Sequence, residues 1–457
     1  MSRKSAPIVS DARFSHSLDT LRSLAQDVLD HARQSGASDC EVDVSEGFGQ
    51  SVTVRHGDVE TIEYNRDKGI GVSVYLGKHR GCASTSDFSR TALRETVEAA
   101  LNIARYTAED VCAGLPEKEL LASREQSAAD LDLYHPWVLS VDAAADLARR
   151  CEQAAFAVSP LVSNSEGATV SIQEGQFVAA NSLGFMGGSP TSRHYLSCSV
   201  IAGGEDGMQR DDWYSTSRDP EQIASPEAIG DYAARRALSR LGPRRIKTCK
   251  APVLFEAPLA AALIASFVHA VSGGSLYRKT SFLVDSLGKR VFSDGVRIDE
   301  RPHLPGALAS SMFDNDGVAT RERAVVVGGE LQGYFLSAYT ARKLGMRTTG
   351  NAGGCHNLIV QPGAEDFPGL LKKMGRGLLV TELLGHGINY VTGDYSRGAA
   401  GYWVEGGEIR HAVEEITIAG NLRDMFLNIA AVGNDVLVRG SRQVGSILVS
   451  EMKLAAG

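Results

Sequence analysis

The sequence has few cysteines, and none of them is spaced for a metal cluster or a disulfide framework. Seven occur in 457 residues, an odd number, and no two form a CxxC pair. They are Cys40, Cys82, Cys112, Cys151, Cys198, Cys249 and Cys355. Disulfide-rich secreted domains and thiolate zinc clusters both depend on paired cysteines. We therefore expect a protein of a reducing compartment.

Clustered histidines and long apolar runs are also missing. No two of the eleven histidines lie within five residues of each other, so no local pair has the spacing of two ligands on one helical face. The most apolar segment, residues 257–271, is too short to cross a bilayer and contains His269. Residues 1–14 are polar and lack the apolar stretch of a signal peptide. We expect a cytoplasmic protein with no membrane segment.

The sequence has no excess of positive charge. It contains 47 Lys and Arg against 55 Asp and Glu, a formal net charge of −8. Direct nucleic-acid binding is therefore not expected. The one concentration of cations, in residues 235–250, is interpreted as a solvated helix face and linker, with a docking patch as the alternative. A hydrophobic content of 43% and 48 glycines fit an ordinary globular chain of two or three domains.

Periodicity predicts helices and antiparallel strands in residues 1–106, which we assign to an N-terminal domain. Apolar residues recur every three or four positions from Leu18 to Ala32, which indicates a helix. Alternating segments follow and predict an antiparallel meander, with a turn at 56–58. A second helix is expected after Ser89. The predicted strands are 40–46, 51–55, 59–64 and 69–76.

Residues 107–135 lack periodicity and are assigned to a linker. The pattern then recurs over residues 136–245, a central unit with a helix after Ser140 and another from Ser225 to Gly242. Its predicted strands are 168–173, 176–180 and 194–201. Two successive helix-plus-meander units suggest an internal repeat.

Residues 246–457 are rich in strands and glycine and are assigned to a C-terminal domain. Short helices are predicted at 258–271, 337–344 and 421–430. The predicted strands are 252–256, 324–327, 333–336, 358–361, 378–383, 402–405 and 447–454. The fold class is therefore α+β, with helix-plus-antiparallel-meander units followed by a strand-rich C-terminal domain that has a sheet or barrel-like core.

Three short patterns could carry chemistry, and each has a structural alternative. Residues 314–317 (Asp-Asn-Asp-Gly) open like a calcium loop but lack its closing glutamate, which favours a hairpin turn. Cys355 and His356 are adjacent, and neighbours on a strand point to opposite faces, which disfavours a nucleophile and base. The glycine-rich residues 272–275 precede the cations at 278–279 and could hold an anion, although a glycine helix cap with solvated cations is the simpler interpretation.

Longer motifs in the C-terminal domain resemble a known family. Residues 392–405 read TGDYSRGAAGYWVE and residues 413–422 read VEEITIAGNL, which is similar to the PmbA (also called TldE) proteins. Residues 272–279 (SGGSLYRK), the hairpin 313–320 and the meander after Glu46 fit the same family. The resemblance covers nearly the whole chain. It implies a subunit that acts with its paralogue TldD in a cytoplasmic metalloprotease that trims unfolded or extended peptides, in microcin maturation and antitoxin turnover.

The sequence departs from the TldD pattern where the metal would bind. TldD carries His-Glu-x-x-x-His on a helix before an Arg-Lys pair, and a C-terminal cysteine as a further zinc ligand. Aligned on the Arg-Lys pair at 278–279, the two histidines and the glutamate fall on Ala265, Ala270 and Ser266, and no cysteine follows Cys355. The resemblance therefore implies no metal or cofactor in this chain, no catalysis by it alone, and zinc in a TldD-type partner.

The same resemblance implies partners and contact residues. A TldD-type subunit, or a second copy in a homodimer, is expected, together with extended or unfolded peptides. The alternatives are a non-catalytic homodimeric regulator of the DNA gyrase modulator type and an independent hydrolase that uses scattered Cys, Ser or His residues. The residues expected to contact peptide or partner are Ser272, Gly273, Gly274, Tyr277, Arg278, Lys279, His386, Asp394, Tyr395, Ser396 and Arg397.

Overall fold

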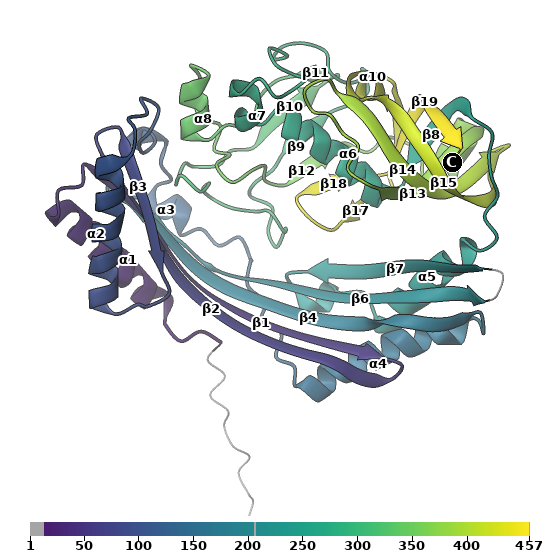
Figure 1. Cartoon of the computed structure of the whole chain (residues 1–457), viewed down its shortest axis with the longest axis horizontal. Coiled ribbons are helices and arrows are strands. Elements are labelled where there is room, and N and C mark those ends of the chain that lie inside the picture. Colours follow the sequence, from purple (N-terminus) through teal and green to yellow (C-terminus); the bar gives the residue numbers. More distant parts are fainter. Residues whose placement is uncertain (1–12, 205–206, 457) are drawn as a thin grey trace, which may run out of the picture.

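The N-terminal and central parts of the chain share one curved antiparallel sheet (Figure 1). The computed structural model describes residues 13–204 and 207–456. The strand order is β3-β2-β1-β4-β6-β7, with β5 beside β4. β1 and β4 join the two parts, because they pair from Glu41–Asn181 to Val54–Ala168. The strands are β1 (Asp39–Arg55), β2 (Asp58–Leu76), β3 (His79–Thr85), β4 (Val162–Asn181), β5 (Met186–Gly187), β6 (Pro190–Gly204) and β7 (Gly207–Ser217).

The strands are longer than the sequence pattern predicted. The segments 40–46 and 51–55 form the single strand β1, 59–64 and 69–76 form β2, and 168–173 and 176–180 belong to β4. Glycines such as Gly47, which lies opposite Gly175, interrupt the alternation of side chains but not the backbone ladder on both sides. The predicted turn at 56–58 is confirmed as a two-residue hairpin loop, with positive φ at His56 and Gly57.

Four amphipathic helices cover one face of this sheet. Figure 1 shows α1, α2 and α4 on its convex side. They are α1 (Leu18–Gln34), α2 (Arg90–Tyr106), α4 (Val141–Val158) and α5 (Pro226–Ser239). The predicted N-caps Ser89 and Ser225 are confirmed, since each side chain accepts a backbone N–H bond of the first turn. The helix predicted near Ser140 begins there, with Ser140 as its N-cap. Both parts thus follow a helix–meander–helix order, as the predicted repeat requires. The segment between them holds only a 3-10 turn (Lys118–Leu120) and α3 (Arg124–Ser127).

The C-terminal part lies over the other, concave face of the sheet (Figure 1) and contains a closed five-stranded barrel. The barrel follows the order β15-β14-β13-β8-β19, and β19 pairs back onto β15. The predicted α+β class with a barrel-like core is confirmed. The barrel strands are β8 (Cys249–Phe255), β13 (Arg376–Leu384), β14 (Asp394–Glu405), β15 (Glu408–Asn421) and β19 (Ile447–Ala456), with β16 (Ile429–Val432) alongside β19.

A second, smaller sheet and five helices complete the C-terminal part. The sheet has the order β11-β10-β9-β12-β18-β17. Its strands are β9 (Ile298–Glu300), β10 (Arg323–Val327), β11 (Glu330–Leu331), β12 (Leu358–Val360), β17 (Leu437–Val438) and β18 (Arg442–Val444). The helices are α6 (Ala257–Ala270), α7 (Gly273–Tyr277), α8 (Ala338–Lys343), α9 (Phe367–Met374) and α10 (Leu422–Leu427). None of the described helices has both the length and the apolar character needed to cross a bilayer.

Two predictions for this part were wrong. Residues 333–336 do not form a regular strand: Phe335 instead exchanges backbone hydrogen bonds with Val271 and Gly273, at the end of α6. The helix predicted at 421–430 ends at Leu427, because Ile429 enters the ladder of β19. In both cases a distant segment supplies the backbone partner, which local periodicity does not reveal.

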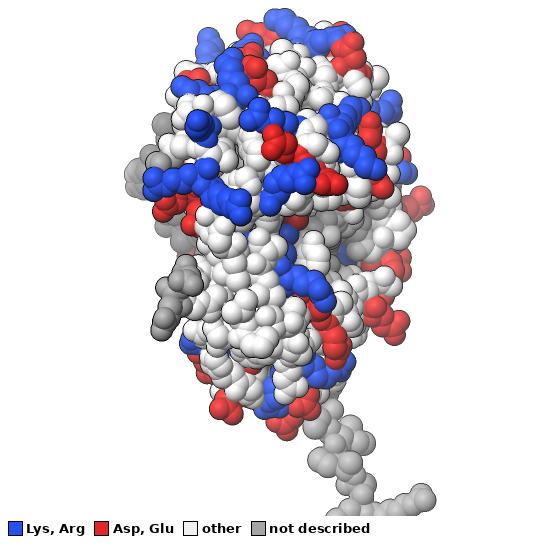
Figure 2. Space-filling view, turned by 90° about the vertical axis from the view of Figure 1, so that its right-hand side faces the viewer, with Lys and Arg blue, Asp and Glu red and all other residues white. Residues whose placement is uncertain are grey.

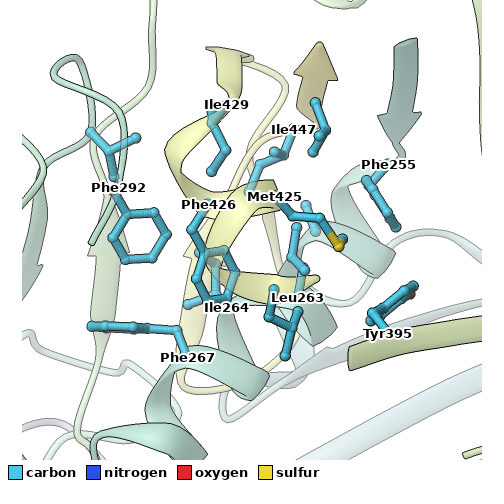
Figure 3. Close-up of a cluster of buried hydrophobic side chains, with 14 of the residues drawn as sticks. Phe255, Leu263, Ile264, Phe267, Phe292, Tyr395, Met425, Phe426, Ile429 and Ile447 are labelled. Atoms are coloured by element: carbon cyan, nitrogen blue, oxygen red, sulfur yellow. The ribbon is translucent and has the colours of Figure 1, made fainter. Parts of the chain in front are cut away.

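The inward side of α6 is packed in the main hydrophobic core. Figure 3 shows Phe267 and Ile264 of α6 beside Phe292 and Phe426. The ring centroid of Phe292 lies 4.9 Å from that of Phe267 and 4.7 Å from that of Phe426, and all three side chains are fully buried. Edge-to-face and tilted contacts at these distances are favourable for aromatic rings. The core therefore fixes the rotation of α6 about its own axis.

Candidate functional site

Of the three positions that align with the metal-binding motif of TldD, Ser266 and Ala270 share the buried side of α6, and Ala265 lies outside it. Ala265 is half-buried, whereas Ser266 is 3% exposed and Ala270 is fully buried. The Ser266 hydroxyl donates to the carbonyl of Ala262, one turn earlier on the same helix. Ala270 faces the aromatic core. The helix thus directs two of the three positions away from any open surface.

The side chains of the described part of the chain do not make a metal site. Among residues 13–204 and 207–456, no three His, Cys, Asp or Glu side chains lie close enough together to hold an ion. His269, the one histidine on α6, lies on its exposed side with its ring 4.1 Å from that of Tyr390. Partial burial and the nearby Arg278 guanidinium lower the pKa of His269, which favours a neutral ring packed at a tilt against Tyr390. The residues present therefore do not fit the zinc of the family motif.

The glycine-rich residues after α6 form a short helix, not the glycine cap that was predicted. Val271 is the C-cap of α6, and Ser272 is the N-cap of α7. A Cβ on Gly273 would lie 2.3 Å from Thr340 Oγ1, so only glycine allows α7 to approach α8 this closely. Packing between these helices, and not a left-handed backbone, requires the glycine.

The cations that follow α7 are exposed. Arg278 Nη1 donates to the hydroxyl of Tyr277 at 3.1 Å, and its guanidinium lies over the same ring. Lys279 has a left-handed backbone, with φ of 55°. Neither cation forms an ion pair with a residue in the described part of the chain. The pair is therefore free to meet an anionic group of a ligand or partner.

The predicted contact residues of β14 have mixed surroundings. Asp394 accepts hydrogen bonds from Thr392 Oγ1 and Asn421 Nδ2, and these bonds lower the pKa of its carboxyl group. Tyr395 is 3% exposed, and burial raises its pKa to about 12, so it is a core residue. Ser396 is exposed, and Arg397 donates to the carbonyl of Leu383 at 3.5 Å.

The loop before β14 lies against the end of α6. Phe282 donates its backbone N–H to the carbonyl of Tyr390 at 2.8 Å, and the Tyr390 ring packs at a tilt against His269. No described hydrogen bond or ion pair joins residues 272–279 to the exposed His386 or to residues 394–397. The loop contacts His269 and Phe282, which flank the α7 segment in the sequence, and the structure does not gather the predicted set into one pocket.

The aspartate-rich turn has a structural role, as predicted. Asp314 is 3% exposed, and its Oδ1 accepts the N–H groups of Asp316 and Val318. Its Oδ2 accepts the N–H of Ala352. Burial, with a further contribution from Asp316, raises the pKa of Asp314 to about 7. Both oxygens of the carboxyl group accept backbone hydrogen bonds, which close the turn at 314–318 and join it to the loop that contains Ala352.

Cys355 and His356 do not form a nucleophile and base. His356 Nε2 lies 3.0 Å from the carbonyl of Gly350, whereas Cys355 Sγ lies 4.0 Å from Ser441 Oγ. Burial raises the pKa of the Cys355 thiol, which keeps it protonated. The predicted separation of the two side chains is confirmed.

The sequence suggested that the basic run at 235–250 is a solvated helix face and linker. The structure shows that part of this run is buried and paired. Arg236 donates to Asp211 and Glu256, and Arg240 pairs with Asp211 and Glu382. Both arginine side chains are largely buried between α5, β7 and the C-terminal part.

The exposed Arg235 and Lys250 pair with Asp231 and Glu451. The exposed Arg244, Arg245 and Lys247 form no ion pair with a described residue. On the face in Figure 2, Lys and Arg side chains lie beside Asp and Glu, so this face offers no purely positive surface.

One buried cation holds three parts of the chain together and escaped sequence analysis. Arg218 is 9% exposed and donates to the carbonyls of Ser192, Ala307 and Leu308. Burial lowers its pKa to about 10. All of its partners are backbone carbonyls of distant segments, so no residue pattern could have identified them.

The concave face of the curved sheet carries a second feature that sequence analysis missed. On β1, Asp43 and Glu41 point to this polar face, opposite Val42 and Val44 in the apolar core. Glu41 is half-buried and Asp43 is exposed. The surrounding protein mass raises the pKa of both carboxyl groups, and with a further contribution from Glu41 that of Asp43 rises to about 6. The alternation of apolar and polar residues in β1 predicts that Glu41 and Asp43 share a polar face. It does not show that the C-terminal part lies over that face.

Comparisons with known proteins cover almost the whole chain. Models of the PmbA/TldA metallopeptidase family match in three parts: domain 1 at residues 40–104, the central domain at 134–241 and the C-terminal domain at 248–456. The chain is 49% identical over 422 residues to Metalloprotease PmbA of Escherichia coli O157:H7, covering 92% of this chain and 93% of the relative.

Solved structures have the same fold. A Bacteroides thetaiotaomicron protein, whose name proposes it as a modulator of DNA gyrase, is 26% identical with a TM-score of 0.91, over 96% of this chain and 99% of that one. TldE from Thermococcus kodakarensis is 18% identical with a TM-score of 0.80, over 95% of this chain and 100% of that one. The latter likeness concerns the fold alone.

Proposed function

Because the chain belongs to the PmbA/TldA metallopeptidase family, we propose that it is the TldE-type, metal-free subunit of a heteromeric zinc metallopeptidase acting on extended peptides. The observation that carries this proposal is the side-chain content of α6. Alanine and serine stand at the motif positions, and two of the three are buried in the core. The metalloprotease name of the 49% identical relative is then explained by a complex whose metal lies in the partner.

In this proposal the zinc of a TldD-type partner supplies an activated water and polarises the peptide carbonyl. The residues of this chain bind and position. The exposed Arg278 and Lys279 are suited to hold a carboxylate of the peptide or partner. The polar concave face of the curved sheet would line the space through which an extended peptide passes, and its exposed backbone edges suit strand addition.

The test is reconstitution from separately purified subunits. We expect the isolated chain to bind no stoichiometric zinc by elemental analysis and to leave an unstructured peptide intact. With a TldD-type partner, chelator-sensitive cleavage should appear. A partner variant with its two motif histidines changed to alanine is the control, and its complex should be inactive. About one tightly held zinc in the isolated chain, or cleavage with the control partner, would refute the proposal.

The alternative, regulation of a DNA-bound enzyme, has weaker support. Its motivation is the name of the Bacteroides relative. In the largest run of cations, Arg235, Arg236, Arg240 and Lys250 are paired with carboxylates. Only the short stretch 244–247 remains for phosphates, so little electrostatic attraction to DNA is expected from this run. Tight, strongly salt-dependent binding of the purified chain to DNA would favour this alternative.

A further inference from the structure

A groove between α1 and α2 carries opposite charges on its two walls. It has a volume of about 270 Å³, and both helices lie on the convex side of the curved sheet (Figure 1). Its floor is apolar, because Val28 and Leu93 are buried at its base. Its walls are polar: Asp27, Asp30, His31 and Gln34 of α1, and Arg90 and Arg94 of α2. The groove is therefore separate from the concave face that the proposed function uses.

Helical periodicity creates the two walls. The α1 residues of the groove recur at steps of three or four positions, so they share one face of that helix. Arg90 and Arg94 are four positions apart and share one face of α2 in the same way. Below them, Val28 of α1 and Leu93 and Val97 of α2 belong to one hydrophobic core, which fixes the separation of the helices. The acidic and basic walls are thus held opposite each other.

The opposite charges do not meet across the groove. Within the described part of the chain, no ion pair or side-chain hydrogen bond joins α1 to α2. Asp30 is paired within its own helix, with Arg33. Asp27, Arg90 and Arg94 are exposed and form no ion pair with any described residue. A molecule with one negative and one positive group would pair with both walls at once.

His31 adds an unsatisfied polar atom to the acidic wall. Its ring Nε2 is buried and has no hydrogen-bond partner among the residues that the structure describes. An unpaired buried polar atom lowers stability, and a bound molecule that pairs with it removes this penalty. A neutral imidazole nitrogen accepts a hydrogen bond from an ammonium group or donates one to a carboxylate, according to the tautomer. The histidine therefore suits either end of a zwitterion.

We propose that this groove binds a small aliphatic zwitterion, either a free amino acid or a short peptide. Its carboxylate binds to Arg90 and Arg94, its ammonium group binds to Asp27, and its aliphatic side chain covers Val28 and Leu93. Two arginines one turn apart suit a carboxylate, because guanidinium groups donate to both of its oxygens. The bound molecule connects α1 to α2 and stabilises the N-terminal part of the chain. The inference rests on the groove alone and not on the proposed peptidase role.

The first test compares ligands by isothermal titration calorimetry with the full chain. We expect saturable binding of L-leucine or of leucyl-leucine, and the tighter of the two identifies the class of ligand. Acetylation of the amino group of that ligand, or amidation of its carboxyl group, should weaken binding at least about tenfold, because each change removes one of the two charges. No saturable binding of either compound at millimolar concentration, or equal binding of the blocked forms, would overturn the proposal.

The second test changes one wall at a time. Asp27→Asn and Arg94→Gln should each raise the dissociation constant about tenfold, and both should fold, because both positions are exposed. Arg105→Gln is the matched control, since Arg105 lies in the last turn of α2, outside the groove, and the affinity should stay unchanged. Asp27→Asn should not affect binding of the acetylated ligand, which has no ammonium group. Wild-type affinity in both groove variants, or an equal loss for the free and the acetylated ligand in Asp27→Asn, would contradict the proposed site.

Discussion

The guanidinium of Arg236 lies 2.7 Å from Glu256 Oε1, and the contact joins α5 to the N-terminus of α6. The same guanidinium donates to Asp211 of β7, and Glu256 is the residue that immediately precedes α6. The central unit is therefore anchored to the helix that corresponds to the metal-binding helix of the family. The partial burial of this cluster means that its charges depend on each other for stabilisation.

We expect Arg236→Met to lower the free energy of unfolding by about 2–4 kcal/mol, because Asp211 and Glu256 keep their negative charges in a largely buried site and lose the guanidinium that pairs with both. Arg235→Met is the matched control, since its pair with Asp231 is exposed, and it should leave the urea midpoint nearly unchanged. Urea unfolding of both variants measures the difference. Equal losses would show that the cluster does not stabilise the contact.

We expect substitution of Arg218 to lower the free energy of unfolding as much as substitution of Arg236. Arg218→Met leaves the carbonyls of Ser192, Ala307 and Leu308 without their donor, and we expect a loss of about 2–4 kcal/mol. Arg218→Lys should recover only part of it, because an ammonium lacks the fork of donors. The exposed Arg193→Met serves as control. If Arg218→Met unfolds at the same urea concentration as wild type, the three-part contact is not stabilising.

The raised pKa of Asp314 predicts a pH dependence of stability. Its carboxyl group has a pKa of about 7 in the folded protein and an ordinary value of 3.8. Between these values the folded state binds more protons than the unfolded one, so this group lowers stability as pH rises from about 4 to 7, by about 1.4 kcal/mol per unit at most. Below the ordinary value and well above pH 7 its contribution is constant.

Asp314→Asn removes that titration. The stability of wild type relative to the variant should fall as pH rises from about 4 to 7 and then level off. The variant itself is expected to be less stable overall, since an amide nitrogen cannot accept the N–H of Ala352. Urea unfolding of both proteins across this pH range provides the comparison. A difference that does not change with pH would contradict the assignment.

Restoring the motif residues should not restore a metal site. The triple variant Ala265→His, Ser266→Glu and Ala270→His places an imidazole and a carboxylate where the native helix is buried in the core. Overpacking and desolvation should cost several kcal/mol. Positions 265 and 270 are also about 140° apart on a regular helix. We expect weak zinc binding at most and no chelator-sensitive turnover without a partner.

Ala265→His alone separates these effects, because Ala265 is half-buried and not in the core. That variant should fold with a near-native unfolding midpoint, whereas Ala270→His alone should be strongly destabilised. Zinc content is measured by elemental analysis after dialysis. Peptide cleavage by the triple variant alone, at a rate near that of a complex with a TldD-type subunit, would show that the site is not lost.

Sequence periodicity was most informative where a segment's own residues determine its structure. The caps Ser89, Ser140 and Ser225 marked helix starts correctly, because the capping bond is made within one turn. The apolar residues predicted to form the buried face of α1 are also mostly buried in the structure. Strand limits were less accurate: the glycines of β1 suggested breaks, and the ladders with β2 and β4 bridged them.

The sequence alone determined that α6 carries Ala265, Ser266 and Ala270 where a family member of the TldD type carries ligands, since the identity of a side chain needs no coordinates. Tertiary structure decided what surrounds those positions, because burial depends on segments such as those of Phe292 and Phe426, far away in the chain. It also decided that Arg236 is paired and largely buried, although it reads as part of a solvated basic run. Ion pairs such as Arg236–Glu256 and ladders such as β1–β4 arise only when segments that are separate in the sequence meet in the folded chain.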